Sequence, residues 1–205
     1  MALRGKTKQE IVTEFRNAEI LDAARKVFAK SGFPGASVEA IAQEAGVAKG
    51  TLYLYYSSKT EIYWAALKDG LVALCQELKK QVGAVQDVRD KIRAYLTTKL
   101  SFFEHHRDFF RIYYAEFGNA IAHPDEFHKG CRELYEQQLR ILKDILAEGA
   151  KQKRIREMKL ESAAFAVFDV TRGAITQRLL GSSDTDMQEN IEFLCEFIWK
   201  GIARQ

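Results

Sequence analysis

The sequence is poor in the residues that interrupt helices or cross-link a chain. Its 205 residues include two prolines and 13 glycines, which favours long helices and argues against a many-stranded β fold. The three cysteines are far apart, odd in number and without a CxxC spacing, so they indicate reduced thiols and exclude a disulfide scaffold. No apolar run reaches the roughly 18 residues that span a bilayer, and no apolar segment of a signal peptide follows the basic N-terminus. We therefore expect a cytoplasmic protein without a membrane partner.

The chain also has little net charge, but that charge is unevenly placed. Residues 1–60 contain nine lysines and arginines against six acidic residues, whereas the remainder holds 22 of each sign. The whole excess of +3 therefore lies in the first sixty residues. A chance distribution of so few charges is one interpretation, and an electrostatic footprint for phosphate groups is the other.

Apolar residues recur at helical spacing along most of the chain. The pattern predicts an all-α fold of about nine helices and no strand. Gly32 should end the first helix and Gly118 the sixth, and Pro124 should begin the seventh. The expected helices lie near residues 20–31, 37–45, 48–55, 58–82, 87–104, 107–117, 124–149, 160–180 and 185–202.

The segment 37–56 reads SVEAIAQEAGVAKGTLYLYY and has the pattern of two short helices joined by a tight turn. Ala42 is small where the helices would cross, and Gly46 supplies the turn, where a positive φ is cheap only for glycine. The second helix would present small, polar and aromatic side chains suited to a DNA groove. A surface helical turn without any ligand would give the same pattern.

The motif belongs to a longer string of residues: Phe28, Gly32, Ser37, Ile41-Ala42, Ala45-Gly46-Val47, Gly50-Thr51-Leu52-Tyr53, Tyr55-Tyr56 and Ser58-Lys59. In order and spacing, this string resembles the N-terminal domain of the TetR family of bacterial transcriptional regulators. The resemblance extends from Glu14 to roughly Leu74, with one departure at Tyr56, where the family more often has phenylalanine. It implies a basic tail (1–13), a DNA-binding domain (14–74) with its motif at 37–56, and an effector-binding and dimerisation domain (75–205).

The resemblance also implies a homodimer that binds a palindromic operator in double-stranded DNA. Ser37, Tyr53, Tyr55 and Lys59 would contact phosphates, and Lys49, Gly50 and Thr51 would lie at the floor of the major groove. The predicted DNA-contacting residues are Ser37, Ala48, Lys49, Gly50, Thr51, Tyr53, Tyr55 and Lys59. The chemistry of these residues agrees, because lysine reaches guanine O6 and N7 and tyrosine hydroxyls anchor phosphates. Arg4, Lys6 and Lys8 would either follow the DNA backbone or form a disordered tail.

The C-terminal part contains a dense aromatic stretch, with seven aromatic residues between positions 102 and 117. Core packing is one interpretation of this stretch. The family resemblance implies the other, a cavity in which a small apolar or amphipathic effector binds and releases the operator. The predicted effector contacts are Phe103, Phe110, Tyr113, Tyr114, Phe117, Phe168 and Arg172.

The last two predicted helices should form the dimer interface by the same resemblance. Their apolar residues make faces wider than one packing partner needs, although an intrachain core would also use them. On the last helix these residues are Ile191, Leu194, Cys195, Ile198, Trp199 and Ile202, and on the preceding one they are Phe165, Phe168, Ile175 and Leu179.

The sequence offers no pattern for catalysis, a metal or a cofactor. His105 and His106 point to different faces of one helix, and His123 and His128 lack the i, i+4 spacing of a metal pair. No GxSxG, P-loop, GxGxxG or HExxH motif occurs. We therefore expect a transcriptional repressor that is not an enzyme. The alternative is a helical small-molecule-binding enzyme or carrier without regulatory DNA binding.

Overall fold

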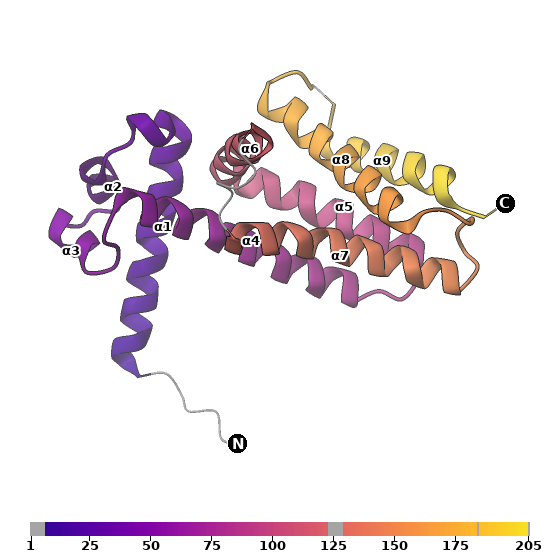
Figure 1. Cartoon of the computed structure of the whole chain (residues 1–205), viewed down its shortest axis with the longest axis horizontal. Helices are drawn as coiled ribbons and strands as arrows, with labels where there is room; N and C mark the ends of the chain where they lie inside the picture. The colour runs from indigo at the N-terminus through magenta and orange to yellow at the C-terminus, as the bar shows by residue number, and fades with distance from the viewer. Residues whose placement is uncertain (1–6, 123–128, 184, 205) are drawn as a thin grey trace. The chain divides into compact units, whose positions relative to one another are not determined.

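The computed structural model describes residues 7–122, 129–183 and 185–204. Within these ranges the chain forms nine helices and no strand, with one isolated antiparallel bridge between Ile155 and Ala203 (Figure 1). This result confirms the predicted all-α fold. The helices are α1 (Lys8–Gly35), α2 (Val38–Glu44), α3 (Lys49–Tyr53), α4 (Lys59–Gly83), α5 (Val88–His105), α6 (Arg107–Ala122), α7 (Lys129–Lys151), α8 (Leu160–Leu179) and α9 (Met187–Ile202).

These helices group into two compact units. The first contains α1, α2, α3, the part of α4 up to Gly70, and α6, and the second contains the rest of α4 with α5, α7, α8 and α9. The sequence-based division placed α6 in the C-terminal domain, whereas its packing places it with the N-terminal helices. The functional division into DNA-binding and effector-binding domains stays a prediction.

The core of the first unit is built around Phe28 of α1. Its ring lies 5.0 Å from that of Tyr63 on α4 and 6.0 Å from that of Phe33. Phe33 follows Gly32, which has a φ of 66° and breaks the helical geometry of α1 four residues before Ala36 caps its end. The predicted end of the first helix at Gly32 is therefore a kink, and one further turn returns the Phe33 ring to the core.

Helix α6 packs on α4 within the first unit through two close contacts. Gly70 lies against the ring of Phe109, since a Cβ atom at this glycine would stand 2.3 Å from a carbon of that ring. The buried Glu116 accepts a hydrogen bond of 3.1 Å from the hydroxyl of Tyr63. Together these contacts explain why α6 groups with the N-terminal helices.

In the second unit, α5 packs against α7, α8 and α9, and α7 packs against α8 (Figure 1). These helices enclose an apolar core to which each of them contributes large side chains. The fully or almost fully buried members include Ile92, Tyr95, Leu96, Leu100, Phe103, Leu142, Leu146, Phe168, Ile175 and Ile191. The unit is a helical bundle of the kind that holds ligands between its helices.

Helix α1 begins earlier than the sequence analysis expected. Thr7 and Glu10 form a capping box, in which Thr7 Oγ1 accepts from the Glu10 amide at 3.2 Å and Glu10 Oε2 accepts from the Thr7 amide at 2.7 Å. Lys8 is therefore the first residue of a helix, and its assignment to a tail before the helix was wrong. Arg4 and Lys6 lie outside the described residues.

Two further helix ends differ from expectation. Helix α6 continues through Gly118 to Ala122, because a glycine ends a helix mainly by adopting a positive φ and Gly118 does not. Asp186, rather than Thr185, caps α9, and its carboxylate accepts from the amides of Gln188 and Glu189. The predicted helix start at Pro124, and His123 and His128, lie outside the described residues.

Candidate nucleic-acid interface

Helices α2 and α3 form a helix-turn-helix that three local features hold together. Ser37 caps α2 by accepting from the amide of Ala40 at 3.1 Å. Gly46 has a φ of 64°, and the next amide, of Val47, donates to the carbonyl of Ala42 at 3.0 Å. Leu52 is fully buried, so it fixes α3 to the core of the first unit.

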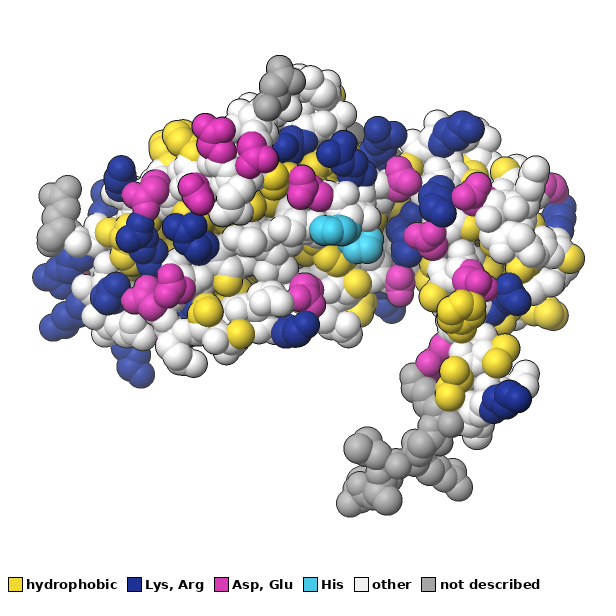
Figure 2. All heavy atoms as spheres, turned by 180° about the vertical axis from the view of Figure 1, so that it is seen from behind, with side chains coloured by type: hydrophobic (Ala, Val, Ile, Leu, Met, Phe, Trp, Pro, Cys, Tyr) yellow, Lys and Arg dark blue, Asp and Glu magenta, His cyan; other side chains and the backbone are white. Residues whose placement is uncertain are grey.

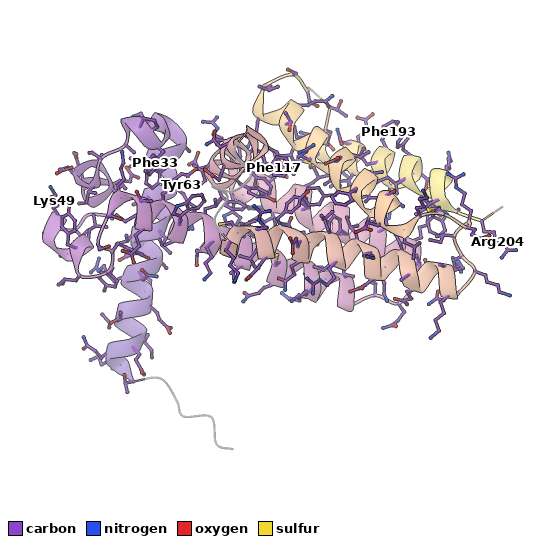
Figure 3. All side chains as sticks on the ribbon, in the orientation of Figure 1. Phe33, Lys49, Tyr63, Phe117, Phe193 and Arg204 are labelled. Carbon is purple, nitrogen blue, oxygen red and sulfur yellow. The ribbon has the colours of Figure 1, made fainter. Side chains whose placement is uncertain are left out.

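One face of α3 is open to solvent. Lys49, Gly50 and Tyr53 are exposed, Thr51 is half-buried, and Ala48 is exposed at the N-cap without a side-chain cap. A Cβ atom added to Gly50 would meet no atom within 4 Å, so this glycine leaves open space beside the backbone. Figure 3 shows Lys49 at the outer edge of the helix. This face can accept a polyanion without rearranging the core beneath it.

Lys49 already has a partner within the chain. Its ammonium forms an ion pair with Glu39 of α2 and lies 5.7 Å from the centre of the Tyr53 ring. The hydrogen bond raises the pKa of Lys49 and lowers the pKa of Glu39 from their ordinary values. Because exposed ion pairs are weak in water, a phosphate or a guanine edge can compete with Glu39 for this lysine.

Lys59 has a structural role that the sequence analysis missed. Its Nζ donates to the carbonyls of Phe33 at 2.8 Å and Ala36 at 2.9 Å, and it lies 3.5 Å from the carbonyl of Pro34. The ammonium also lies 4.6 Å from the centre of the Phe33 ring. Lys59 therefore ties the start of α4 to the turn between α1 and α2. Its predicted phosphate contact would require these bonds to loosen.

The residues after α3 include one anchor and one exposed apolar side chain. Tyr56 donates to Asn17 Oδ1 on α1 at 2.5 Å, and burial raises the pKa of its hydroxyl. This bond gives a reason for tyrosine where the family more often has phenylalanine. Tyr55 is half-buried. Leu54 is 84% exposed, and the sequence analysis missed it because an apolar residue in a short helix suggests core packing.

Comparison with known proteins agrees with this geometry. Residues 20–66, which include α2 and α3, match the model of the bacterial regulatory proteins of the tetR family. The fatty acid metabolism regulator protein of Bacillus subtilis is 23% identical over 185 residues, which cover 90% of this chain and 94% of that protein. Residues 20–66 are therefore similar to the DNA-binding domain of the tetR family. With this domain and these relatives, the chain is a DNA-binding transcriptional regulator.

Two other similarities extend beyond the motif. The crystal structure of the regulator FadR from Bacillus subtilis in complex with stearoyl-CoA has a TM-score of 0.76 and 22% identity, and the match covers 90% of this chain and 98% of that one. The transcriptional repressor KstR2 of Mycobacterium tuberculosis is 26% identical over 141 residues, which cover 69% of this chain and 70% of that protein. The fold of the whole chain is thus that of a TetR-family regulator.

The predicted effector contacts do not gather in one unit. Those on α6 belong to the first unit, where Phe109 stacks on Tyr113 at 5.6 Å and Phe110 meets Tyr114 edge-on at 5.8 Å. Phe110 and Tyr113 are buried there, and Tyr114 and Phe117 are half-buried. Phe103, Phe168 and Arg172 belong to the second unit, where both rings are buried and Arg172 pairs with Asp169 at 3.0 Å.

The sequence analysis missed two buried polar side chains in the second unit. Lys99 of α5 and Gln138 of α7 are both 0% exposed. Burial lowers the pKa of Lys99 to about 7. Helical periodicity could have indicated that Lys99 is buried, because it lies on the same helical face as Ile92, Leu96 and Phe103.

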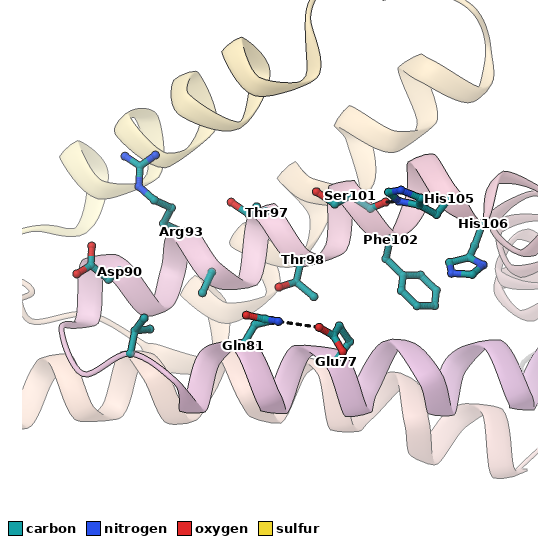
Figure 4. Close-up of a pocket in the computed structure, with 12 residues that line it drawn as sticks. Glu77, Gln81, Asp90, Arg93, Thr97, Thr98, Ser101, Phe102, His105 and His106 are labelled. Atoms are coloured by element: carbon teal, nitrogen blue, oxygen red, sulfur yellow. Dashed lines mark hydrogen bonds between the residues drawn. The ribbon is translucent and has the colours of Figure 1, made fainter.

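The surface of the second unit carries a groove of about 590 Å³ between α4 and α5 (Figure 4). Gln81 donates to Glu77 at 2.7 Å on one wall, and the rings of Phe102 and His106 lie 4.2 Å apart at one end. Both described histidines are exposed, and Figure 2 shows histidine side chains at the surface near charged groups. The effector contacts predicted from sequence lie elsewhere.

Helix α9 has two apolar faces, and the sequence analysis identified the inner one. Ile191, Leu194 and Ile198 are buried within their own chain, because this face of α9 packs on α5. The outer face carries Phe193 (Figure 3), which is 65% exposed, and Phe197, which is 59% exposed, and their rings stack with centres 6.0 Å apart. Phe197 also lines a groove of about 690 Å³ between α8 and α9.

The described residues lack a metal-binding cluster and a membrane-spanning helix. They contain no group of three or more histidine, cysteine, aspartate or glutamate side chains that could hold a metal ion. They also contain no helix that is both long and apolar enough to cross a membrane.

Proposed function

We propose that the chain is a cytoplasmic, homodimeric repressor that binds a palindromic operator through α3 and is released by a long-chain acyl effector. The observation that carries the DNA-binding part is the open face of α3, with Lys49, Gly50 and Tyr53 exposed over a buried Leu52. A helix held this way presents its first residues to the edges of bases in a major groove. Ser37, Ala48, Thr51, Tyr55 and Lys59 complete the proposed contacts.

The test of DNA binding is fluorescence anisotropy with a labelled duplex from upstream of the chain's own coding region. We expect saturable binding with a dimer per operator, weakened strongly by about 0.3 M added salt because phosphate contacts release counterions. A scrambled duplex of the same composition is the control. Equal affinity for the upstream and scrambled duplexes in this assay, followed by a genome-wide operator selection that enriches no sequence, would refute the proposal of a specific operator.

The outer face of α9 supports the proposed dimer. Stacked, exposed phenylalanines beside an apolar groove are costly to leave in water, and each stabilises association when it is buried. We expect Phe197→Glu to shift the protein to monomers in sedimentation velocity. Phe15→Glu, at a phenylalanine that is 66% exposed on α1, is the matched control and should leave the dimer intact. A monomeric wild type would refute the proposal.

The proposed effector rests on likeness to proteins of fatty acid metabolism. FadR of Bacillus subtilis was solved with stearoyl-CoA, and it shares the fold of this chain over almost its whole length. In the second unit, Phe103 and Phe168 offer the apolar core that an acyl chain needs, with Arg172 at its edge. The α6 residues Phe110, Tyr113, Tyr114 and Phe117 stay predicted effector contacts. Stearoyl-CoA, but not coenzyme A alone, should release the labelled operator.

We propose no catalytic role for the chain, because its named relatives are transcriptional regulators. The repressor assignment follows KstR2, which is named a repressor. A reporter gene behind the operator tests it, since deletion of the regulator should raise expression. Lower expression after deletion would make the protein an activator.

A further inference from the structure

The buried amine of Lys99 is an unusual feature of the second unit. The whole side chain is 0% exposed, and its Nζ has no hydrogen-bond partner among the described residues. The ammonium lies 3.6 Å from the centre of the Phe168 ring on α8 and 5.8 Å from that of Tyr95 on its own helix. An aromatic face stabilises a cation only in part, so the amine keeps hydrogen-bonding capacity that these rings cannot use.

Gln138 presents a second polar group to the core of the same bundle. Neither its amide nitrogen nor its amide oxygen has a hydrogen-bond partner among the described residues, although the residue is 0% exposed. Tyr135, one helical turn earlier on α7, meets the Phe168 ring edge-on at 5.1 Å. Phe168 is therefore in contact both with the amine of Lys99 and with the turn of α7 that carries Gln138.

The charged groups around Lys99 leave its charge largely uncompensated. Asp169 on α8 is a carboxylate that favours the charged amine, but it is already paired with Arg172 at 3.0 Å. On α4, burial raises the pKa of the Cys75 thiol to about 11, so this thiol is neutral at neutral pH. Tyr135 of α7 and Tyr95 of α5 are phenols, which are also neutral there.

Leaving these groups without partners is expensive. A buried polar group without a hydrogen bond costs about 1–3 kcal/mol, and a buried charge costs more. A trapped water could satisfy the amide of Gln138, but it carries no charge to offset that of Lys99. A carboxylate does both, because it is anionic and has two oxygens that accept several hydrogen bonds.

We propose that Lys99 and Gln138 bind the carboxylate of a long-chain carboxylic acid whose chain lies in the apolar core of the bundle formed by α5, α7 and α8. This inference rests on the proposed function for the existence of a small-molecule effector, and it names the chemistry of the effector's polar end.

The test is isothermal titration of the full-length protein, without DNA, with dodecanoate and with dodecanol. Wild type should bind the acid more tightly than the alcohol. Lys99→Met should weaken dodecanoate binding about tenfold to a hundredfold, since a charged hydrogen-bond partner is lost, and should leave dodecanol binding unchanged. Gln138→Leu should weaken it less. Lys80→Met, at a lysine side chain that is 73% exposed on α4, is the matched control and should change nothing.

Proton uptake gives a second readout, which would not change if Lys99 only filled space in the core. Because burial holds the pKa of Lys99 near 7 and an anion raises it, binding of dodecanoate at about pH 8 should take up a proton. The binding enthalpy should therefore depend on the ionisation enthalpy of the buffer in wild type but not in Lys99→Met. Equal loss of acid and alcohol binding in this variant, or no proton uptake in wild type, would overturn the proposal.

The failure of this inference can be told from a failure of the proposed function. If stearoyl-CoA releases the operator equally from wild type and Lys99→Met, and dodecanoate does not bind, the regulator stands and the carboxylate site falls. If dodecanoate binds through Lys99 but no ligand changes operator affinity, the carboxylate site is supported and ligand-controlled release of the operator is refuted.

Discussion

Lys49 and Lys99 show how differently the two units treat a charged side chain. Lys49 lies at the surface of the first unit on a five-residue helix, and Glu39 pairs with it. Lys99 lies in the core of the second unit, where an aromatic ring is in contact with its amine and Asp169 is paired elsewhere. A lysine at the surface stays solvated at little cost in free energy and can pair with a large polyanion. A buried ammonium group instead requires a small partner that enters the core. The two lysines therefore point to two classes of ligand.

The largest effect should come from a test of whether the units are energetically separate. Phe28→Ala removes the ring at the centre of the first core and should lower the free energy of unfolding of that unit by about 3–5 kcal/mol. Operator binding should fall with it, while dodecanoate binding in the second unit should persist. Urea denaturation followed by circular dichroism, with both binding assays, measures this. Phe15→Ala, at an exposed ring on α1, is the control, and parallel loss of both ligands would show that the units fold as one.

The next largest effect is the pH dependence of the free energy of unfolding, to which Lys99 should contribute and exposed lysines should not. In the unfolded chain its pKa is near 10.5, and in the folded chain burial lowers it to about 7. Between these values the unfolded chain binds more protons, so the free energy of unfolding should rise with pH, by about 2 kcal/mol from pH 7 to pH 9. Lys99→Met should remove this rise and Lys80→Met should not. Urea denaturation of the effector-free protein at several pH values measures it, and identical slopes would contradict burial of a titrating amine.

Lys49 should show its importance only when DNA is present. Lys49→Ala should weaken operator binding by about 1–3 kcal/mol and reduce the preference for operator over scrambled duplex, because a base contact is lost. Glu39→Gln keeps the lysine and releases it from its partner, so binding should stay equal or tighten. Anisotropy titrations at one fixed salt concentration compare the variants. An equal loss on both duplexes would make Lys49 a phosphate contact.

The smallest effects should divide two neighbouring tyrosines. Tyr53→Phe should weaken binding to all duplexes by about 1 kcal/mol, since the exposed hydroxyl is proposed to donate to a phosphate. Tyr56→Phe should instead lower the free energy of unfolding by about 1 kcal/mol through loss of the hydrogen bond to Asn17, with DNA affinity unchanged. Anisotropy and thermal unfolding of both variants test the division. Loss of DNA affinity in Tyr56→Phe together with loss of stability in Tyr53→Phe would contradict this division.

The helix-turn-helix could be predicted from the sequence because its features are local. Ser37 caps the residue three positions later, and Gly46 adopts its positive φ within a turn of a few residues. The early start of α1 is equally local, since Thr7 and Glu10 form a capping box, but the buried apolar residues of this helix begin only at Ile20, so hydrophobic periodicity does not extend to its first turns.

Features that depend on distant contacts could not be predicted in the same way. Lys59 looks like a phosphate ligand until the fold brings the carbonyls of Phe33 and Ala36 to its amine. The inner and outer faces of α9 are both apolar, so periodicity alone could not say which one packs on α5. The partners of Lys99 come from other helices, and only packing shows that its amine is in contact with Phe168 rather than with water.

The contact between Gly70 and Phe109 has a consequence for the history of this sequence. A methyl group at position 70 would overlap the ring, so alanine at position 70 requires a smaller or displaced side chain at position 109. Among descendants and ancestors of the chain, alanine at 70 should accompany a smaller residue at 109, and a large aromatic residue at 109 should accompany glycine. An evolutionary record of paired substitutions at these positions would thus trace how long α6 has been joined to α4.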